Sequence, residues 1–225
     1  MKFTSALIVS VAAMLASVAS HAHFTWLEVA PDSPQTLRLR FSEEILEATP
    51  RDIQEKAATM RVSTPDGAAI AMTFGEEFMS APVPGNAPSI IGTQDYGVLD
   101  RGEAGRGQFM LKYHARAARD AAAAAIASGL PVDVTAKVDG ESMLVTVLLG
   151  GKPVADAELV VTLPQELAPA EAKTDAAGQA RFSVKSGDWI AIRAMVAQTG
   201  SGQHEGKSYE LVRHYSTLTF FHGTK

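Results

Sequence analysis

Apolar and polar residues alternate along much of this chain, and this period constrains the fold more than any other feature of the sequence. Every second side chain is apolar in TLRLRF, residues 36–41, and the pattern recurs in VDVTAKV, residues 132–138. Successive side chains of a β-strand point to opposite faces of a sheet, so the alternation is typical of strands that bury one face. We therefore expect an all-β fold.

Turn-forming residues separate the strand-like runs at short intervals. Pro65-Asp66-Gly67, Asp139-Gly140 and Ala177-Gly178 each lie between two such runs. These residue pairs favour tight turns, so the first two mark candidate hairpins. In the second half of the chain, short strands spaced by turns predict a β-sandwich of about seven strands.

One segment breaks the pattern. HARAARDAAAAAIASG, residues 114–129, is rich in alanine and ends on glycine. Alanine has the highest helix propensity and glycine commonly follows a helix C-terminus, so we expect a short Ala-rich helix here. We place a domain boundary at its end. The fold would then comprise two small β-sandwich-like domains: a β-rich domain of residues 23–129 that ends with the helix, and a β-sandwich of residues 130–225.

Residues 1–22 have the pattern of a secretory signal peptide. Lys2 precedes an apolar run that closes on the small residues Ser20 and Ala22. The run is too short and too rich in alanine and serine for a membrane span, which needs about 20 strongly apolar residues. Cleavage after Ala22 would make His23 the N-terminus, and cleavage after Ser20 is a poorer alternative that would leave His21. We expect a periplasmic protein with no membrane span after processing.

Composition argues against several classes of function. The chain has 20 Lys and Arg against 25 Asp and Glu, and loss of Lys2 with the leader takes the formal net charge from −5 to −6 without any basic cluster, so no nucleic-acid partner is expected. Without cysteine, neither a disulfide nor a thiolate metal site can form. The methionines are dispersed, so a sulfur site for copper(I) is not expected. Nucleotide-binding loops, G-x-S-x-G and H-E-x-x-H are absent, and we do not expect an enzyme.

Several stretches resemble one known family. They are HAHFTWLEV at the start of the mature chain, IIGTQDYGVLDRGE with the following LKYHARA, TVLLGGKPVADAELVVTLP, TDAAGQARFSVKSGDWIAIRA and YELVRHYSTLTF. Together they are similar to a periplasmic bacterial domain family of unknown function that is often labelled nickel-uptake-transporter-like. The resemblance spans nearly the whole mature chain, and its second half also resembles immunoglobulin-like and transthyretin-like modules. It implies a periplasmic β protein that handles divalent nickel or cobalt, with a membrane metal transporter as its partner.

Histidines are the candidate metal ligands. As an N-terminal residue, His23 would offer its α-amine and its ring Nδ1 to one cation, and a second histidine would complete a three-nitrogen site suited to copper and, less selectively, to nickel. The amine must lose its proton to bind, so affinity should fall in acid. If processing leaves His21, the amine, two backbone amides and the His23 ring could form a square-planar site for copper(II) or nickel(II).

Two further histidines are candidates. His214 shares its strand parity with Leu218, which directs it to an apolar face or a groove between sheets, and we expect it to complete the site at the terminus. His114 is the third candidate and departs from the family, which often has an aromatic residue there. His204 and His222 are expected at the surface.

Two functions remain open. The first is a periplasmic divalent transition-metal binding protein for nickel, cobalt or copper, accessory to metal uptake or handling, with His23, His214 and His114 as ligands. The alternative is a non-catalytic envelope interaction module that binds a protein or glycan, with incidental histidines. Acidic residues within 95–103 could add oxygen ligands, although their spacing is not that of a calcium loop and a solvated glycine-rich connection is favoured.

Overall fold

The structure is a computed structural model that describes residues 23–29, 33–85, 87–100, 107–164, 166 and 168–223. The predicted signal peptide of residues 1–22 lies outside the described residues, as does Glu103, one of the acidic residues considered as ligands. Strands make up 59% of the structure and helices 6%, which confirms the all-β fold. Within the described ranges, no helix is long and apolar enough to cross a membrane.

The described elements are short helices and strands of very different length. The helices are α1 (Arg51–Ala57) and α2 (Ala121–Ala124). The strands of the first half are β1 (Phe24–Val29), β2 (Thr36–Ser42), β3 (Arg61–Ser63), β4 (Thr73–Phe74), β5 (Met79–Pro82), β6 (Ser89–Asp100) and β7 (Gln108–Ala118). Those of the second half are β8 (Val132–Asp139), β9 (Ser142–Leu149), β10 (Lys152–Pro153), β11 (Glu158–Thr162), β12 (Ala170–Lys173), β13 (Gln179–Ser183), β14 (Asp188–His204) and β15 (Lys207–His222).

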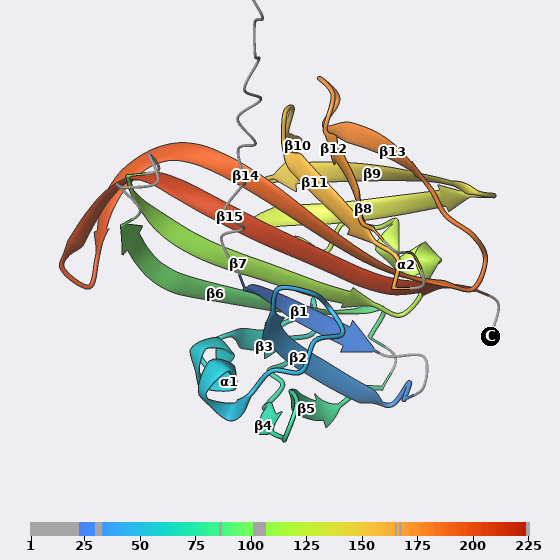
Figure 1. Ribbon diagram of the computed structural model, residues 1–225, viewed down its shortest axis with the longest axis horizontal. Helices are drawn as coiled ribbons and strands as arrows, with labels where there is room; N and C mark the ends of the chain where they lie inside the picture. The colour runs from blue at the N-terminus through green and yellow to red at the C-terminus, as the bar shows by residue number, and fades with distance from the viewer. Residues whose placement is uncertain are drawn as a thin grey trace, which may run out of the picture.

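The strands form three sheets. The N-terminal sheet has the order β1-β2-β5-β4, and the central sheet has the order β12-β11-β14-β15-β7-β6-β3. The C-terminal sheet has the order β10-β9-β13, with β8 also paired to β9. Figure 1 shows the long strands of the central sheet crossing the molecule, with the C-terminal sheet above them and the N-terminal sheet below.

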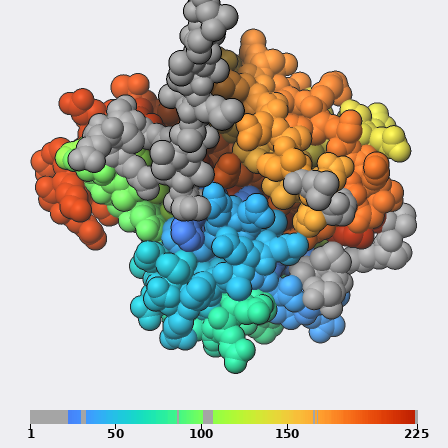
Figure 2. All heavy atoms as spheres, viewed as in Figure 1, coloured from blue at the N-terminus to red at the C-terminus, as the bar shows by residue number. Residues whose placement is uncertain are grey.

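Each face of the central sheet contributes to a separate hydrophobic core. Val134 and Val145 of the C-terminal sheet pack with Leu218 on one face, and Leu27 and Leu39 of the N-terminal sheet belong to the cluster on the other face. The alternation seen in the sequence supplies these buried rows, because every second side chain of a strand points to the same face. In the space-filling view, the blue-to-green N-terminal residues form one lobe and the orange residues another (Figure 2).

The central sheet takes strands from both sides of the expected boundary at residue 129. β7 precedes that boundary and β15 follows it, yet the two pair in parallel, from Phe109 opposite Leu211 to Ala117 opposite Thr219. The two halves of the chain are therefore joined by main-chain hydrogen bonds within one sheet, and not only by the Ala-rich segment.

The Ala-rich helix is present but covers only Ala121–Ala124. Its N-cap, Asp120, accepts a hydrogen bond of 2.8 Å from the Ala123 amide. Our expectation of helix over residues 114–118 is wrong, because β7 continues to Ala118. Ala115 and Ala117 are fully buried in the core toward the N-terminal sheet, and this packing outweighs the helix propensity of alanine.

Candidate functional site

The structure brings His114 and His214 together and places His23 elsewhere. Tyr113 and His114 are consecutive in β7, so their side chains point to opposite faces of the central sheet. Tyr113 contacts His23, whereas His114 contacts His214 on the face covered by the C-terminal sheet. Our expectation that His214 completes a site at His23 therefore does not fit the fold, because the central sheet separates them.

His23 lies where β1 begins, and three hydroxyl groups of the central sheet hold this strand in place. The bonds run from Tyr113 to the carbonyl of His23 (2.8 Å), from Thr217 to that of Thr25 (2.8 Å) and from Thr219 to that of Leu27 (2.6 Å). Alternate carbonyls of a strand point to the same edge. Among the described strands, β1 pairs with β2 alone, so the three hydroxyls supply hydrogen bonds to the carbonyls on its other edge. The position of His23 is thus fixed by side chains that are distant in sequence.

Aromatic rings surround the start of β1. The ring of His23 is half-buried and lies 5.5 Å from that of Phe41, which in turn contacts Tyr96 and Tyr113. Burial raises the pKa of Tyr96. Phe24 is buried and packs edge-on against Tyr215 of the central sheet, with ring centroids 5.0 Å apart. This packing leaves the His23 ring partly accessible while its backbone is held.

The rings of His114 and His214 face each other edge to edge. Nε2 of His114 lies 3.0 Å from Nδ1 of His214, the ring centroids are 5.3 Å apart, and the planes differ by 19°. The distance between the centroids exceeds the distance between the two nitrogens by about two ring radii. Both nitrogens therefore lie close to the line that joins the centroids. The lone pair of one ring is therefore directed at the other ring.

The contact between His214 and Gln198 assigns the tautomers of the pair. Nε2 of His214 lies 3.3 Å from Oε1 of Gln198, an exposed residue of β14. An amide oxygen can only accept, so His214 carries its proton on Nε2, and its Nδ1 accepts from Nε2–H of His114. Nδ1 of His114 then has a lone pair. It is buried and has no hydrogen-bond partner in the described part of the chain.

Burial keeps both imidazoles neutral. His114 and His214 are 3% and 5% exposed. Burial, the His214 ring and Lys112 lower the pKa of His114 to about 3, and Asp95 opposes them. Burial and Lys112 lower the pKa of His214 to about 4, again against Asp95. Lys112 and Asp95 form an ion pair of 3.1 Å, and both rings are available as neutral ligands at physiological pH.

A buried polar layer lies beside the pair, between β7 and β8. Arg116 and Asp133 are 3.7 Å apart and each is 3% exposed. Arg116 also donates to Ser89 Oγ at 3.0 Å and to the Ala123 carbonyl at 2.6 Å, while Asp133 accepts from the Ser128 hydroxyl. These bonds join the central sheet to the C-terminal sheet and fix the backbone of β7, the strand that contains His114.

The remaining histidines and Asp100 do not join either location. His204 lies at the tip of the β14–β15 hairpin, and His222 lies at the opposite end of β15, where its carbonyl accepts from the Gly187 amide at 2.6 Å. Asp100 lies 3.2 Å from Gln108. Among the described residues, no group of three or more histidine and acidic side chains is placed to hold a metal.

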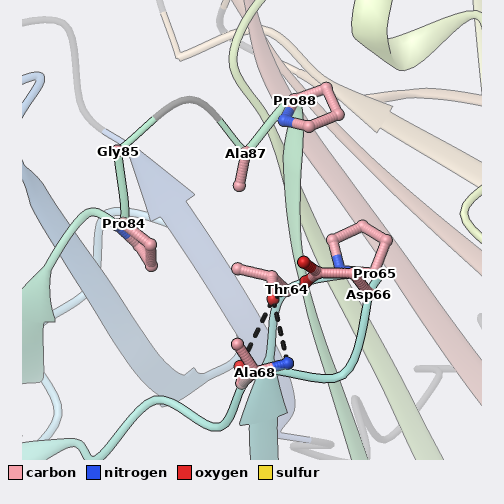
Figure 3. Close-up of a pocket in the computed structure, with 8 residues that line it drawn as sticks. All are labelled: Thr64, Pro65, Asp66, Ala68, Pro84, Gly85, Ala87 and Pro88. Atoms are coloured by element: carbon pink, nitrogen blue, oxygen red, sulfur yellow. Dashed lines mark hydrogen bonds between the residues drawn. The ribbon is translucent and has the colours of Figure 1, made fainter.

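A pocket of about 500 Å³ lies apart from these histidines. Figure 3 shows the turn of residues 64–68 on one side of the pocket, with Pro84, Gly85, Ala87 and Pro88 on the other. The Thr64 hydroxyl bonds to the backbone of Ala68, and its bond to Asp66 is the main cause that lowers the pKa of that exposed carboxyl. Proline and alanine carbons form most of the remaining lining, so the pocket offers no set of metal ligands.

Comparisons with known proteins assign no roles to these residues. No family model matches the chain, and a search of curated proteins finds no match.

Two neighbours of the histidine pair could not be predicted from the sequence: Gln198, which lies 3.3 Å from His214, and Lys112, which is opposite His214 in the sheet. The alternation places residues on faces, but strand register decides which of them meet, and the parallel pairing of β7 with β15 left no signal in a single sequence.

Proposed function

We propose that this is a periplasmic protein that binds a divalent transition metal, nickel or copper, through its processed N-terminus, as an accessory to metal uptake or handling. The hydrogen bond from Tyr113 to the carbonyl of His23 carries the proposal. A ligand is selective for geometry only when its supporting shell is rigid, and this bond anchors the backbone of the residue that would bind the ion.

The two processing outcomes predict different ligand sets. Cleavage after Ala22 gives two nitrogens, the amine and Nδ1 of His23, and the fold brings neither His114 nor His214 to them. Cleavage after Ser20 gives four nitrogens in a plane: the amine of His21, two backbone amides and the His23 ring. The second set needs no histidine from elsewhere in the fold, and copper(II) and nickel(II) both accept square-planar nitrogen ligands. It therefore fits the position of His23 better.

Protons compete with the metal at the terminus. An α-amine has a reference pKa of about 7.7 to 8.0 and must lose its proton to bind. Affinity should therefore fall as the pH drops below about 7.5. This dependence distinguishes a site at the terminus from one made of imidazoles alone.

The test begins with protein recovered from the periplasm after export with its own leader. Its intact mass defines the first residue, and calorimetry with nickel(II) and copper(II) measures affinity. We expect about one ion per chain, loss of binding in His23→Ala, and unchanged binding in His204→Ala, which removes a histidine at the hairpin tip.

Two results would overturn the proposal. A chain that begins at Phe24 or later lacks the ligands altogether. Equal affinity of His23→Ala and the unaltered protein would show that the terminus is not a ligand, and the non-catalytic envelope interaction module would become the better account.

A further inference from the structure

We propose a second metal site on the opposite face of the central sheet, in which copper(I) binds in line between Nε2 of His114 and Nδ1 of His214. The site does not depend on processing of the leader, and it is independent of the function proposed above. It is built from two buried neutral rings and from the unpartnered Nδ1 of His114.

The direction of the nitrogens selects the ion. Both atoms lie close to the line between the ring centroids, so an ion placed between them would have its two ligands on opposite sides. Copper(I) has a filled d shell, accepts two ligands in a line, and binds imidazole readily. Zinc requires four ligands in a tetrahedron, which these facing rings and the described acids do not supply.

The rings must separate for the ion to enter. Metal–nitrogen bonds of about 2.0 Å to each ring put the nitrogens about 4 Å apart, against 3.0 Å in the hydrogen-bonded pair. His214 is the ring that can move, because its outer contact is a 3.3 Å bond to the exposed Gln198. His114 is enclosed beside the Arg116–Asp133 layer and would stay in place.

Nδ1 of His114, which has no hydrogen-bond partner among the described residues, can accept the proton that the ion displaces from Nε2. In the hydrogen-bonded pair, His114 carries its proton on Nε2 and His214 carries its own on Nε2, the nitrogen that faces Gln198. When copper(I) binds, the His114 proton moves from Nε2 to Nδ1 and frees the lone pair that the ion needs. Each ring keeps one proton and the copper arrives already reduced, so no proton is released and no electron is transferred.

The surrounding charges favour a monovalent ion. Lys112 on β7 and Asp95 on β6 lie on the same face as the pair and compensate each other at 3.1 Å. Arg116 and Asp133 compensate each other on the side of β8. Asp95 is the carboxylate whose charge acts on both rings, and Lys112 compensates it. The cost of burying an ion rises steeply with its charge, so a single positive charge is tolerated more easily here than two.

Silver(I) nitrate in chloride-free buffer is a redox-inert probe for this site. In protein labelled with ¹⁵N in its histidine rings, we expect silver(I) to shift the His114 Nε2 and His214 Nδ1 resonances together. The proton of His114 should move from Nε2 to Nδ1 in the same titration. The proposal would be overturned if silver(I) shifts only the ring resonances of His204 or His222. It would also be overturned if the tautomer of His114 does not change in the titration.

Variants separate this site from the terminus. His214→Gln should weaken silver(I) binding by more than about tenfold, since it removes one of two ligands, whereas the matched variant His204→Gln should not change it. His23→Ala should also leave it unchanged. Equal binding by His214→Gln and His204→Gln would contradict the site. If His214→Gln does not fold, the resonances of the unaltered protein decide the question alone.

Discussion

The hydroxyl of Tyr113 donates a 2.8 Å hydrogen bond to the backbone carbonyl of His23, although 90 residues separate the two in sequence. The next residue of β7, His114, points to the other face and bonds to His214. One strand therefore supports both candidate sites and keeps them on opposite sides of the central sheet. A single ion cannot be shared between them.

Tyr113→Phe should destabilise the start of β1. The substitution keeps the ring, which packs against Phe41, but leaves the His23 carbonyl without this donor. We expect a loss of about 1 to 2 kcal/mol in the free energy of unfolding in urea, and faster hydrogen exchange along β1. Tyr209→Phe in the β14–β15 hairpin is the matched control. Similar losses in the two variants would show that the bond to His23 has no special role.

The histidine pair should make stability depend on pH. The unfolded chain titrates with histidine pKa values near 6.5, whereas the folded pKa values of His114 and His214 are about 3 and about 4. Between pH 6.5 and 4 the unfolded state therefore binds protons that the folded state does not. Stability should be complete above pH 6.5 and should fall as the pH drops, by at most about 1.4 kcal/mol per pH unit for each proton.

Replacing both rings isolates this effect from the titration of carboxylates. In the double variant His114→Phe and His214→Phe, melting temperatures measured from pH 7 to pH 4 should fall less steeply than in the unaltered protein. His204→Gln, at the hairpin tip, should retain the full slope. Identical slopes in the double variant and the unaltered protein would mean that the pair is not neutral in the folded state.

The buried ion pair of Glu28 and Arg40 should contribute strongly to the N-terminal lobe. Their closest atoms are 3.0 Å apart, and the two side chains are 0% and 5% exposed. Glu28→Gln keeps the shape but leaves a buried guanidinium without this carboxylate, and we expect a loss of about 3 to 5 kcal/mol in urea denaturation. Glu55→Gln breaks the exposed pair with Arg51 and should cost less than about 0.5 kcal/mol. Equal losses would contradict the burial of Glu28.

Local patterns in the sequence predicted much of the fold. The period of two placed Leu37 and Leu39 in the core, and the turn at Asp139-Gly140 joins β8 to β9 as expected. Residues 114–118 were mispredicted because alanine favours helix locally, whereas burial in the central sheet decides the outcome. The parallel pairing of β7 with β15 unites residues about 100 positions apart, and no local pattern encodes such a contact.

The candidate ligands were predictable as residues but not as sites. Strand parity predicted that His214 shares a face with Leu218, and both residues are buried in β15, four positions apart. Parity alone did not show that β1 packs on the opposite face, which separates His214 from His23. The meeting of His114 with His214 depends on the register of two strands, and register is set by the whole sheet.

Calorimetric titration of copper(II) into the processed protein, with its terminal amine free or acetylated, tests the central claim most directly. Acetylation at a pH of about 6.5 modifies the α-amine before the lysines, whose reference pKa is about 10.4. It removes a ligand whether the chain begins at His21 or at His23. We expect about one copper(II) ion per free chain and at least tenfold weaker binding after acetylation. Equal affinity of the two forms would contradict metal binding at the terminus.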